Sequence, residues 1–154
     1  MPPMGRVMGV DVGTVRVGIA LSDEMCITAS PHAMVPRQGD RRTAEAIRAI
    51  AVENVVERIV VGLPLRMNGT EQPSTLDARA MGEAIRSVTG LPVVEWDERL
   101  TSAQAERALI EGNVRREKRR LVVDQVAAAL MLQSYLDSPP ARSAPASHAE
   151  PPES

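Results

Sequence analysis

Lone acidic residues interrupt two apolar stretches of this 154-residue chain. Asp11 stands between the valines of Val10–Val12, and Asp124 follows two valines within the run Leu121–Ala128. A carboxylate in apolar surroundings is costly unless it is paired, hydrogen-bonded or bound to a metal. The chain is therefore confined to folds that bring these acids to a partner, and a shared metal site is the arrangement that we expect.

A third acid, Glu98, follows an apolar run that ends at Trp96. The junction between a strand and the next helix is a frequent active-site position in α/β sheets. The neighbouring Asp97 competes for the same role, and a solvated acid near a helix N-terminus is the structural alternative.

The other two acids also have structural alternatives. Asp11 would be a turn-capping residue, but it precedes the turn at Gly13 and lies within the apolar run. Asp124 would form a salt bridge with Arg120, one helical turn away. The small pair Ala127–Ala128 instead favours a helix that approaches a sheet closely and presents Asp124 to a shared metal.

The candidate metal ligands are carboxylates rather than cysteine or histidine. The chain has one cysteine and two widely separated histidines, which excludes an intrachain disulfide and a zinc site of Cys and His ligands. Carboxylates suit Mg²⁺ or Mn²⁺, and two such ions ~4 Å apart can clamp the attacking and leaving oxygens of a phosphodiester. The candidate catalytic and metal-binding residues are Asp11, Glu98 and Asp124.

The basic residues are unevenly distributed, although the net charge is only −2. A basic segment at 115–120 favours contact with phosphates. Phe is absent, and Trp and Tyr occur once each, which disfavours aromatic platforms for base stacking. The candidate nucleic-acid-binding residues, each with a solvated surface charge as its alternative, are Arg16, Arg66, Arg99, Lys118 and Arg119.

Hydrophobic periodicity predicts strands and helices that alternate after an initial hairpin. The predicted strands are 6–12, 16–21, 27–35, 57–63 and 91–96, and the predicted helices are 40–53, 74–89, 101–112 and 117–136. Pro31 places the third strand at a sheet edge, and Asn68-Gly69 predicts a mobile loop over 65–73. The result is an α/β fold with a five-stranded mixed sheet, its first three strands antiparallel and the rest parallel, flanked by helices.

Helix boundaries are predicted from capping residues. Asp40 is the expected N-cap of the first helix, and Ser74 with Asp77 resembles a capping box for the second, whose inner face would include Leu76. Gly90 is expected to end that helix. The folded domain is predicted over 1–137, with a disordered tail rich in Pro, Ala and Ser at 138–154. We expect no signal peptide, no membrane-spanning helix and a cytoplasmic location.

Four segments resemble, in order and spacing, the motifs of the YqgF (RuvX) family over about residues 5–137. They are Asp11–Ala20, Val61–Leu65, Asp97–Ser102 and Asp124–Ala128. The resemblance implies a ribonuclease H-like fold and a cytoplasmic bacterial nuclease that uses divalent metal and matures the 5′ end of 16S ribosomal RNA. It also implies an acidic triad of Asp11, Glu98 and Asp124 with a basic residue at Arg16, and a substrate loop after Pro64.

The chain departs from related patterns at four places. Val15 and Gln125 stand where this family often has Lys and Ser. The resolvases of the RuvC type carry further acids at places that look like Gly62–Pro64 and Ala127 here. These differences favour RNA processing over junction resolution.

The expected activity is hydrolysis of nucleic-acid phosphodiesters that leaves 5′-phosphate and 3′-hydroxyl ends, with RNA or ribosomal precursor particles as partners. One alternative is a Holliday junction resolvase, which would need a dimer to cut branched DNA symmetrically. Another is a non-catalytic nucleic-acid-binding accessory factor. A nucleotidase or kinase fragment is disfavoured because such folds need a second lobe. Whether the protein is a monomer or a homodimer stays open.

Overall fold

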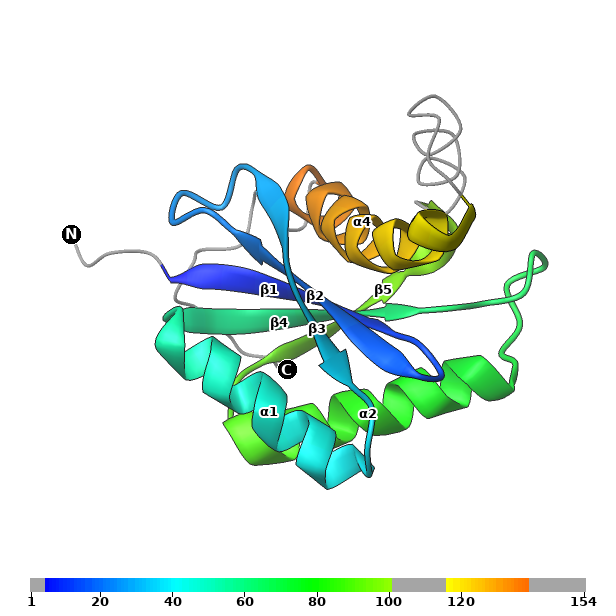
Figure 1. The fold of residues 1–154 in the computed structure, drawn as a ribbon, viewed down its shortest axis with the longest axis horizontal. Helices are drawn as coiled ribbons and strands as arrows, with labels where there is room; N and C mark the ends of the chain where they lie inside the picture. Colours follow the sequence, from blue (N-terminus) through cyan, green and yellow to red (C-terminus); the bar gives the residue numbers. More distant parts are fainter. Residues whose placement is uncertain (1–4, 101–115, 139–154) are drawn as a thin grey trace.

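The computed structural model describes residues 5–100 and 116–138, and for residues 100 and 116–125 it describes the backbone alone. Five strands form one sheet in the order β3-β2-β1-β4-β5 (Figure 1). The strands are β1 (Arg6–Val12), β2 (Arg16–Ser22), β3 (Ala29–Pro36), β4 (Val56–Leu63) and β5 (Val93–Asp97). The first three pair antiparallel, and β1–β4 and β4–β5 pair parallel, which confirms the predicted mixed sheet.

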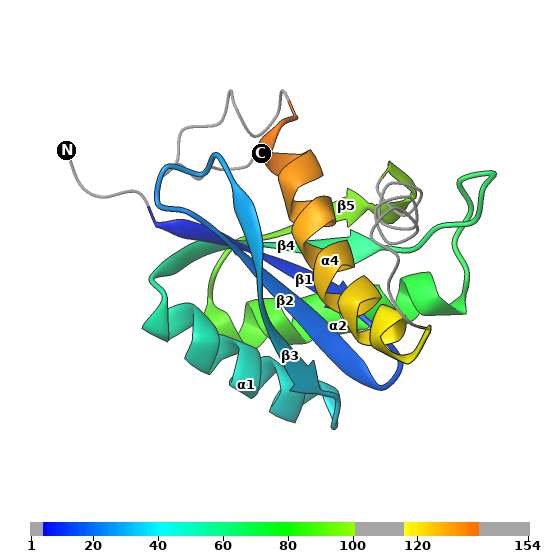
Figure 2. The ribbon, with the colours of Figure 1, turned by 45° about the horizontal axis from the view of Figure 1, so that its top comes forward.

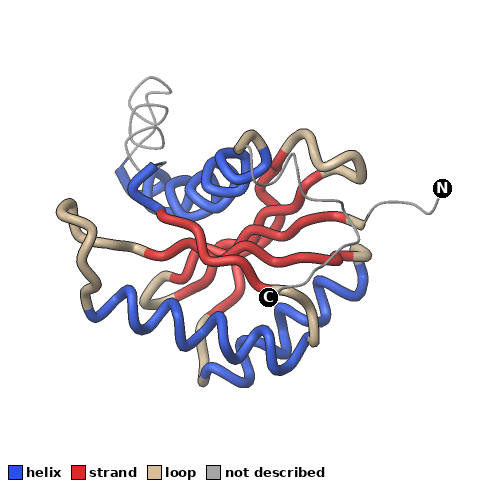
Figure 3. The backbone as a smooth tube through the Cα atoms, turned by 180° about the vertical axis from the view of Figure 1, so that it is seen from behind, coloured by secondary structure: helices blue, strands red, loops and turns tan. Residues whose placement is uncertain are grey.

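Helices cover both faces of the sheet. They are α1 (Asp40–Glu53), α2 (Pro73–Thr89), the short η1 (Glu98–Leu100) and α4 (Arg116–Leu136). α1 and α2 lie on one face and α4 lies on the other, so the sheet is the middle layer (Figures 2 and 3). The predicted helix 101–112 lies outside the described residues. Within the part of the chain that the structure describes, no helix is both long and apolar enough to cross a bilayer.

The alternation of side chains along β1 separates two hydrophobic cores. Met8 and Val10 are fully buried in the cluster under α1 and α2. Val7 belongs to the second cluster, together with Leu132 and Tyr135 of α4. Asp11 shares the parity of Val7, so it belongs to the face that α4 covers.

α4 approaches β1 closely at Gly9. A Cβ on Gly9 would lie 2.8 Å from the Cβ of Leu132 and 3.2 Å from the carbonyl oxygen of Ala128. Near the other end of the helix, Arg58 at the start of β4 donates a 2.8 Å hydrogen bond to the Tyr135 hydroxyl. α4 therefore runs antiparallel to β1 and β4, and its N-terminal half extends towards their C-terminal ends.

The predicted helix starts were wrong in detail. Gly39, not Asp40, is the N-cap of α1. The capping box of α2 is formed by Gln72 and Thr75 rather than by Ser74 and Asp77, because Pro73 begins the helix one residue earlier. The inner face of α2 shifts accordingly: the buried residues are Thr75, Ala78, Met81, Gly82 and Ile85.

Two other local predictions are confirmed. Pro31 lies in β3, which is an edge strand of the sheet. Gly90 ends α2 in the left-handed conformation, with φ of 72°, and its N–H donates to the carbonyl of Arg86. A third local prediction is wrong: Leu76 was expected on the inner face of α2, but it is 57% exposed, because the buried face of the helix runs from Thr75 through Ala78.

Candidate active site

The side chains of Asp11 and Glu98 meet at one edge of the sheet. Asp11 is the penultimate residue of β1, and Glu98 begins η1 directly after β5. β1, β4 and β5 run parallel, so their C-terminal ends share this edge. Both side chains are half-buried, and a hydrogen bond joins them. This arrangement is consistent with the prediction from the sequence that Asp11 and Glu98 lie together.

Burial raises the pKa of Glu98 to about 9, and the hydrogen bond and negative charge of Asp11 add to the effect. Glu98 therefore keeps its proton at neutral pH and donates it to the Asp11 carboxylate. Two carboxyl groups share one proton when no cation balances their charge. This oxygen-only donor pair fits a hard divalent cation such as Mg²⁺ or Mn²⁺.

Gly62, near the end of β4, makes room for the Glu98 side chain. A Cβ on Gly62 would lie 2.5 Å from Oε2 of Glu98 and 2.7 Å from its Cγ. Gly62 pairs in register with Trp96, two residues before Glu98. The role of Gly62 as the floor of the site was not predicted, although a glycine inside a buried strand does signal the close approach of another group.

Asp97 faces a different partner from Glu98. It accepts hydrogen bonds from the backbone N–H of Arg99 at 3.0 Å and from Nη2 of the same residue at 2.6 Å. The side-chain hydrogen bond with Arg99 holds the pKa of Asp97 below its usual range. Of the two competing acids, Glu98 is therefore the one that joins Asp11.

Position 124 lies on the backbone of α4, on the helical stripe that includes Ala128 and Leu132. Those two residues lie over Gly9, and position 124 is one turn closer to the C-terminal end of β1, where Asp11 stands. The side chain of Asp124 is outside the description. Among the described side chains, no group of three His, Cys, Asp or Glu residues could hold a metal, so the third ligand stays a prediction.

The predicted nucleic-acid-binding residues lie on different elements. Arg16 begins β2, is half-buried and shares the parity of Ala20, which faces α4. Arg66 is exposed in the loop after β4, and its Nη1 donates to the carbonyl of Glu71 at 2.6 Å. Lys118 and Arg119 lie in the first turn of α4, and their side chains are not described.

Arg37 fixes the turn beside Asp11, a role that the sequence did not reveal. Its Nη1 donates to the carbonyl of Gly13 at 2.9 Å, and its Nη2 donates to Asp77 of α2 at 2.7 Å. The turn is tight, because a Cβ on Gly13 would lie 2.6 Å from the carbonyl oxygen of Arg16. Arg37 thus ties the β1–β2 turn to α2.

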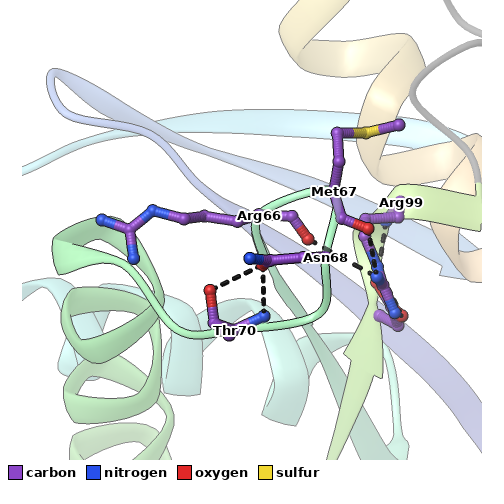
Figure 4. Close-up of polar contacts among 6 residues, drawn as sticks. Arg66, Met67, Asn68, Thr70 and Arg99 are labelled. Atoms are coloured by element: carbon purple, nitrogen blue, oxygen red, sulfur yellow. Dashed lines mark hydrogen bonds and ion pairs between the residues drawn. The ribbon is translucent and has the colours of Figure 1, made fainter.

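The loop between β4 and α2 is anchored to η1 by Arg99 (Figure 4). Nη1 of Arg99 donates to the carbonyls of Arg66 and Met67, at 3.4 and 3.1 Å. Gly69, with φ of 90°, closes the tip by donating its N–H to the Arg66 carbonyl at 2.8 Å. Arg99, predicted to bind nucleic acid, is engaged with Asp97 and with this loop.

The sequence profile of the RuvX family, described as Holliday junction resolvase, matches residues 5–138. The chain belongs to this family. It is 42% identical over 132 residues to a protein of Syntrophomonas wolfei, covering 86% of this chain and 94% of the relative. It is 46% identical to a protein of Caldanaerobacter subterraneus, covering 86% and 96%. Both relatives carry the provisional name pre-16S rRNA nuclease, so this RuvX protein is a member of a nuclease family.

A solved structure of the fowlpox virus Holliday junction resolvase shares the fold. It superposes with a TM-score of 0.51 at 13% identity and covers 86% of this chain and 98% of the viral protein. The viral resolvase has also been solved in complex with substrate Holliday junction DNA, with a TM-score of 0.50 to this chain. The expected ribonuclease H-like architecture is confirmed.

Proposed function

We propose that this RuvX protein is a divalent-metal-dependent nuclease that matures the 5′ end of pre-16S ribosomal RNA. The observation that carries the proposal is the Asp11–Glu98 pair over Gly62, in a chain closely related to proteins named for that substrate. The relatives are bacterial, so the proposed place of action is the cytoplasm, where ribosomal RNA is made.

The proposed site assigns separate tasks to acidic and basic residues. Asp11, Glu98 and Asp124 would hold two Mg²⁺ or Mn²⁺ ions. When bound, the metal supplies Lewis-acid polarisation of the scissile phosphate. Arg16, on the same face as Asp11, offers a guanidinium to the phosphate oxygens. Water attacks phosphorus in line, and the cleaved strand keeps a 3′-hydroxyl and a 5′-phosphate.

Basic residues that lie outside the carboxylate pair would position the substrate RNA strand. Arg66 in the loop after β4 and the first turn of α4, with Lys118 and Arg119, lie on elements that reach the same end of the sheet. Basic residues on these elements fit a strand that crosses this end of the molecule.

Resolution of Holliday junctions is the second candidate function. The family is described by that activity, and the viral resolvase shares the fold. The span Gly62–Pro64, where the RuvC-type pattern has an acid at the end of the fourth strand, argues against it, because this chain has no acid there. A resolvase would also need a dimer with two sites.

The test uses purified protein with Mn²⁺ and two labelled substrates, a single-stranded RNA with the pre-16S 5′ sequence and a four-way DNA junction. Asp11→Asn and Asp124→Asn are the site variants. Asp137→Asn is the matched control, because Asp137 lies just past the opposite end of α4. We expect RNA cleavage that both site variants lose and the control keeps.

Other outcomes lead to other functions. Symmetric junction cuts lost in the site variants would establish the resolvase. Binding of RNA without cleavage, unchanged in Asp11→Asn, would establish the accessory factor. Full RNA cleavage by Asp11→Asn would refute the assignment of the carboxylates.

A further inference from the structure

Met67 stands at the tip of the loop between β4 and α2. Its exposed fraction of 91% is the highest among the large apolar residues that the structure describes. Figure 4 shows its side chain pointing away from the contacts that close the loop. Single exposed apolar side chains are common, and what distinguishes Met67 is its position on an ordered loop that Arg99 ties to η1.

The loop holds Met67 in a defined place. Arg99, the residue after Glu98, donates to the carbonyl of Met67 at 3.1 Å. On the far side of the tip, Asn68 accepts hydrogen bonds from the backbone N–H and the hydroxyl of Thr70, at 3.0 and 2.7 Å. A side chain on a pre-ordered loop loses less conformational entropy when it binds. Because Arg99 directly follows Glu98 and ties this loop to η1, the tip is held next to the element that carries Glu98.

The aromatic residues of the chain are committed elsewhere. The sequence contains one Trp, one Tyr and no Phe. Trp96 and Tyr135 pack edge-to-face with ring centroids 5.5 Å apart, in the core beneath α4. Tyr135 is buried and Trp96 is half-buried against it, so neither ring stands free as a stacking platform at the surface. An exposed methionine is a substitute, because its flexible, polarizable thioether packs well against aromatic faces.

We propose that Met67 packs against an unstacked nucleobase of a single-stranded RNA substrate and thereby positions the strand for cleavage. The proposal rests on the proposed function and adds a residue that selects unpaired RNA. Apolar side chains that insert at base steps are used by other nucleic-acid-binding proteins, methionine among them. Arg66, next to Met67, provides a cation for the adjoining phosphate.

The test measures binding of labelled single-stranded RNA in the Asp11→Asn background, so that cleavage does not consume the substrate. Met67→Ser removes the apolar contact and Met67→Leu keeps it. Met25→Ser is the matched control, because Met25 is 68% exposed in the β2–β3 turn, at the opposite end of the sheet. We expect Met67→Ser to raise Kd about ten-fold, the equivalent of about 1.4 kcal/mol. Met67→Leu and Met25→Ser should stay within about two-fold of the parent.

A second readout reports the base itself. 2-Aminopurine placed at successive positions of the RNA brightens when it leaves the base stack. We expect brightening at one position near the scissile bond, lost in Met67→Ser and kept in Met67→Leu. Equal RNA affinity and equal 2-aminopurine signals for Met67→Ser and its parent would overturn the proposal, as would equal weakening by Met25→Ser.

Failure of the proposed function gives a different result. It appears as absence of RNA cleavage by the wild-type protein, or as cleavage by Asp11→Asn. The Met67 result is read from binding and fluorescence, so the two failures are separable.

Discussion

Gly62 is the residue that allows two carboxyl groups to meet over the sheet. Its missing side chain leaves the space that the Glu98 carboxylate occupies, 2.5 Å from where a Cβ would be. The residues on either side of Gly62 in β4, Val61 and Leu63, are buried, so the backbone of β4 cannot easily shift. The methyl group that alanine would add at Gly62 is therefore expected to disturb the geometry of the site more than the stability of the fold.

Gly62→Ala should displace Glu98 and lower kcat/KM for the nuclease by about a hundred-fold, the usual effect of misplacing a reacting group by 1 Å. Quenching of Trp96 fluorescence by Mn²⁺ should weaken in parallel, because Trp96 is the only tryptophan and pairs with Gly62. Gly82→Ala is the control, since its Cβ would meet atoms only at 3.7 Å or beyond. Wild-type Mn²⁺ affinity in Gly62→Ala would contradict this account.

Glu98 should make the metal-free protein less stable as pH rises. Its pKa is about 9 in the folded protein and near 4.5 in the unfolded chain, so folding favours the protonated form. The stabilisation is complete below pH 4.5 and is lost as pH rises towards 9. Glu98→Gln has no proton to lose, so it removes this dependence, and it should stabilise the protein at pH 8 by about 1–3 kcal/mol, on the scale of about 1.4 kcal/mol per unit of pKa shift.

Urea unfolding in EDTA at pH 5 and pH 8 measures the effect of Glu98→Gln. Glu45→Gln is the control, because Glu45 is exposed on α1 and forms an exposed ion pair with Arg41. Identical pH dependence in the wild-type protein and Glu98→Gln would show that the carboxyl proton is not shared as described.

Among the elements, η1 and the loop after β4 act as a unit because Arg99 joins them. The forked guanidinium contacts Asp97 on one side and two loop carbonyls on the other. A lysine keeps the charge but cannot form this set of contacts. The position of the loop therefore depends on the shape of the Arg99 side chain as well as on its charge.

Arg99→Lys should loosen the loop and raise the initial rate of tryptic cleavage after Arg66 severalfold, because proteolysis follows local opening. Mass spectrometry of the first fragments measures the rate. Arg41→Lys is the control: it also preserves a trypsin site, and Arg41 lies on α1 in an exposed ion pair. An unchanged rate after Arg66 would mean that Arg99 does not brace the loop.

In the whole molecule, α4 covers the face of the sheet opposite α1 and α2 and carries the third predicted ligand (Figure 3). α4 contacts β1 through Gly9, and the two elements run antiparallel. The distance of α4 from the sheet therefore sets how far position 124 lies from Asp11. The packing of α4 on the sheet therefore also determines whether the candidate site can assemble.

Gly9→Ala should push α4 away from β1 and destabilise the protein by about 1–3 kcal/mol, as expected for overpacking in a dense core. Mn²⁺ affinity should fall as well, because the helix that carries Asp124 moves. Urea unfolding and Mn²⁺ titration measure the two effects, with Gly82→Ala again as the control. Wild-type stability in Gly9→Ala would refute the close contact.

Much of the architecture followed from local patterns. The strands, their mixed directions and the edge position of β3 were predicted, because alternation and proline act over a few residues. Helix starts at α1 and α2 were displaced by one or two residues, because several polar residues compete for each cap. The loop after β4 was located correctly, but its hydrogen bonds to Arg99 come from a residue far along the chain.

The sequence by itself determined the order of the elements, the family and which acids have no local reason to be where they are. Only the tertiary structure decided that Glu98 rather than Asp97 meets Asp11, that Gly62 makes room for it, and that Arg37 and Arg99 hold the neighbouring loops. The physical reason is that these contacts join strands and loops distant in sequence. Local sequence propensity cannot predict these contacts, because they form only when the layers of the fold pack together.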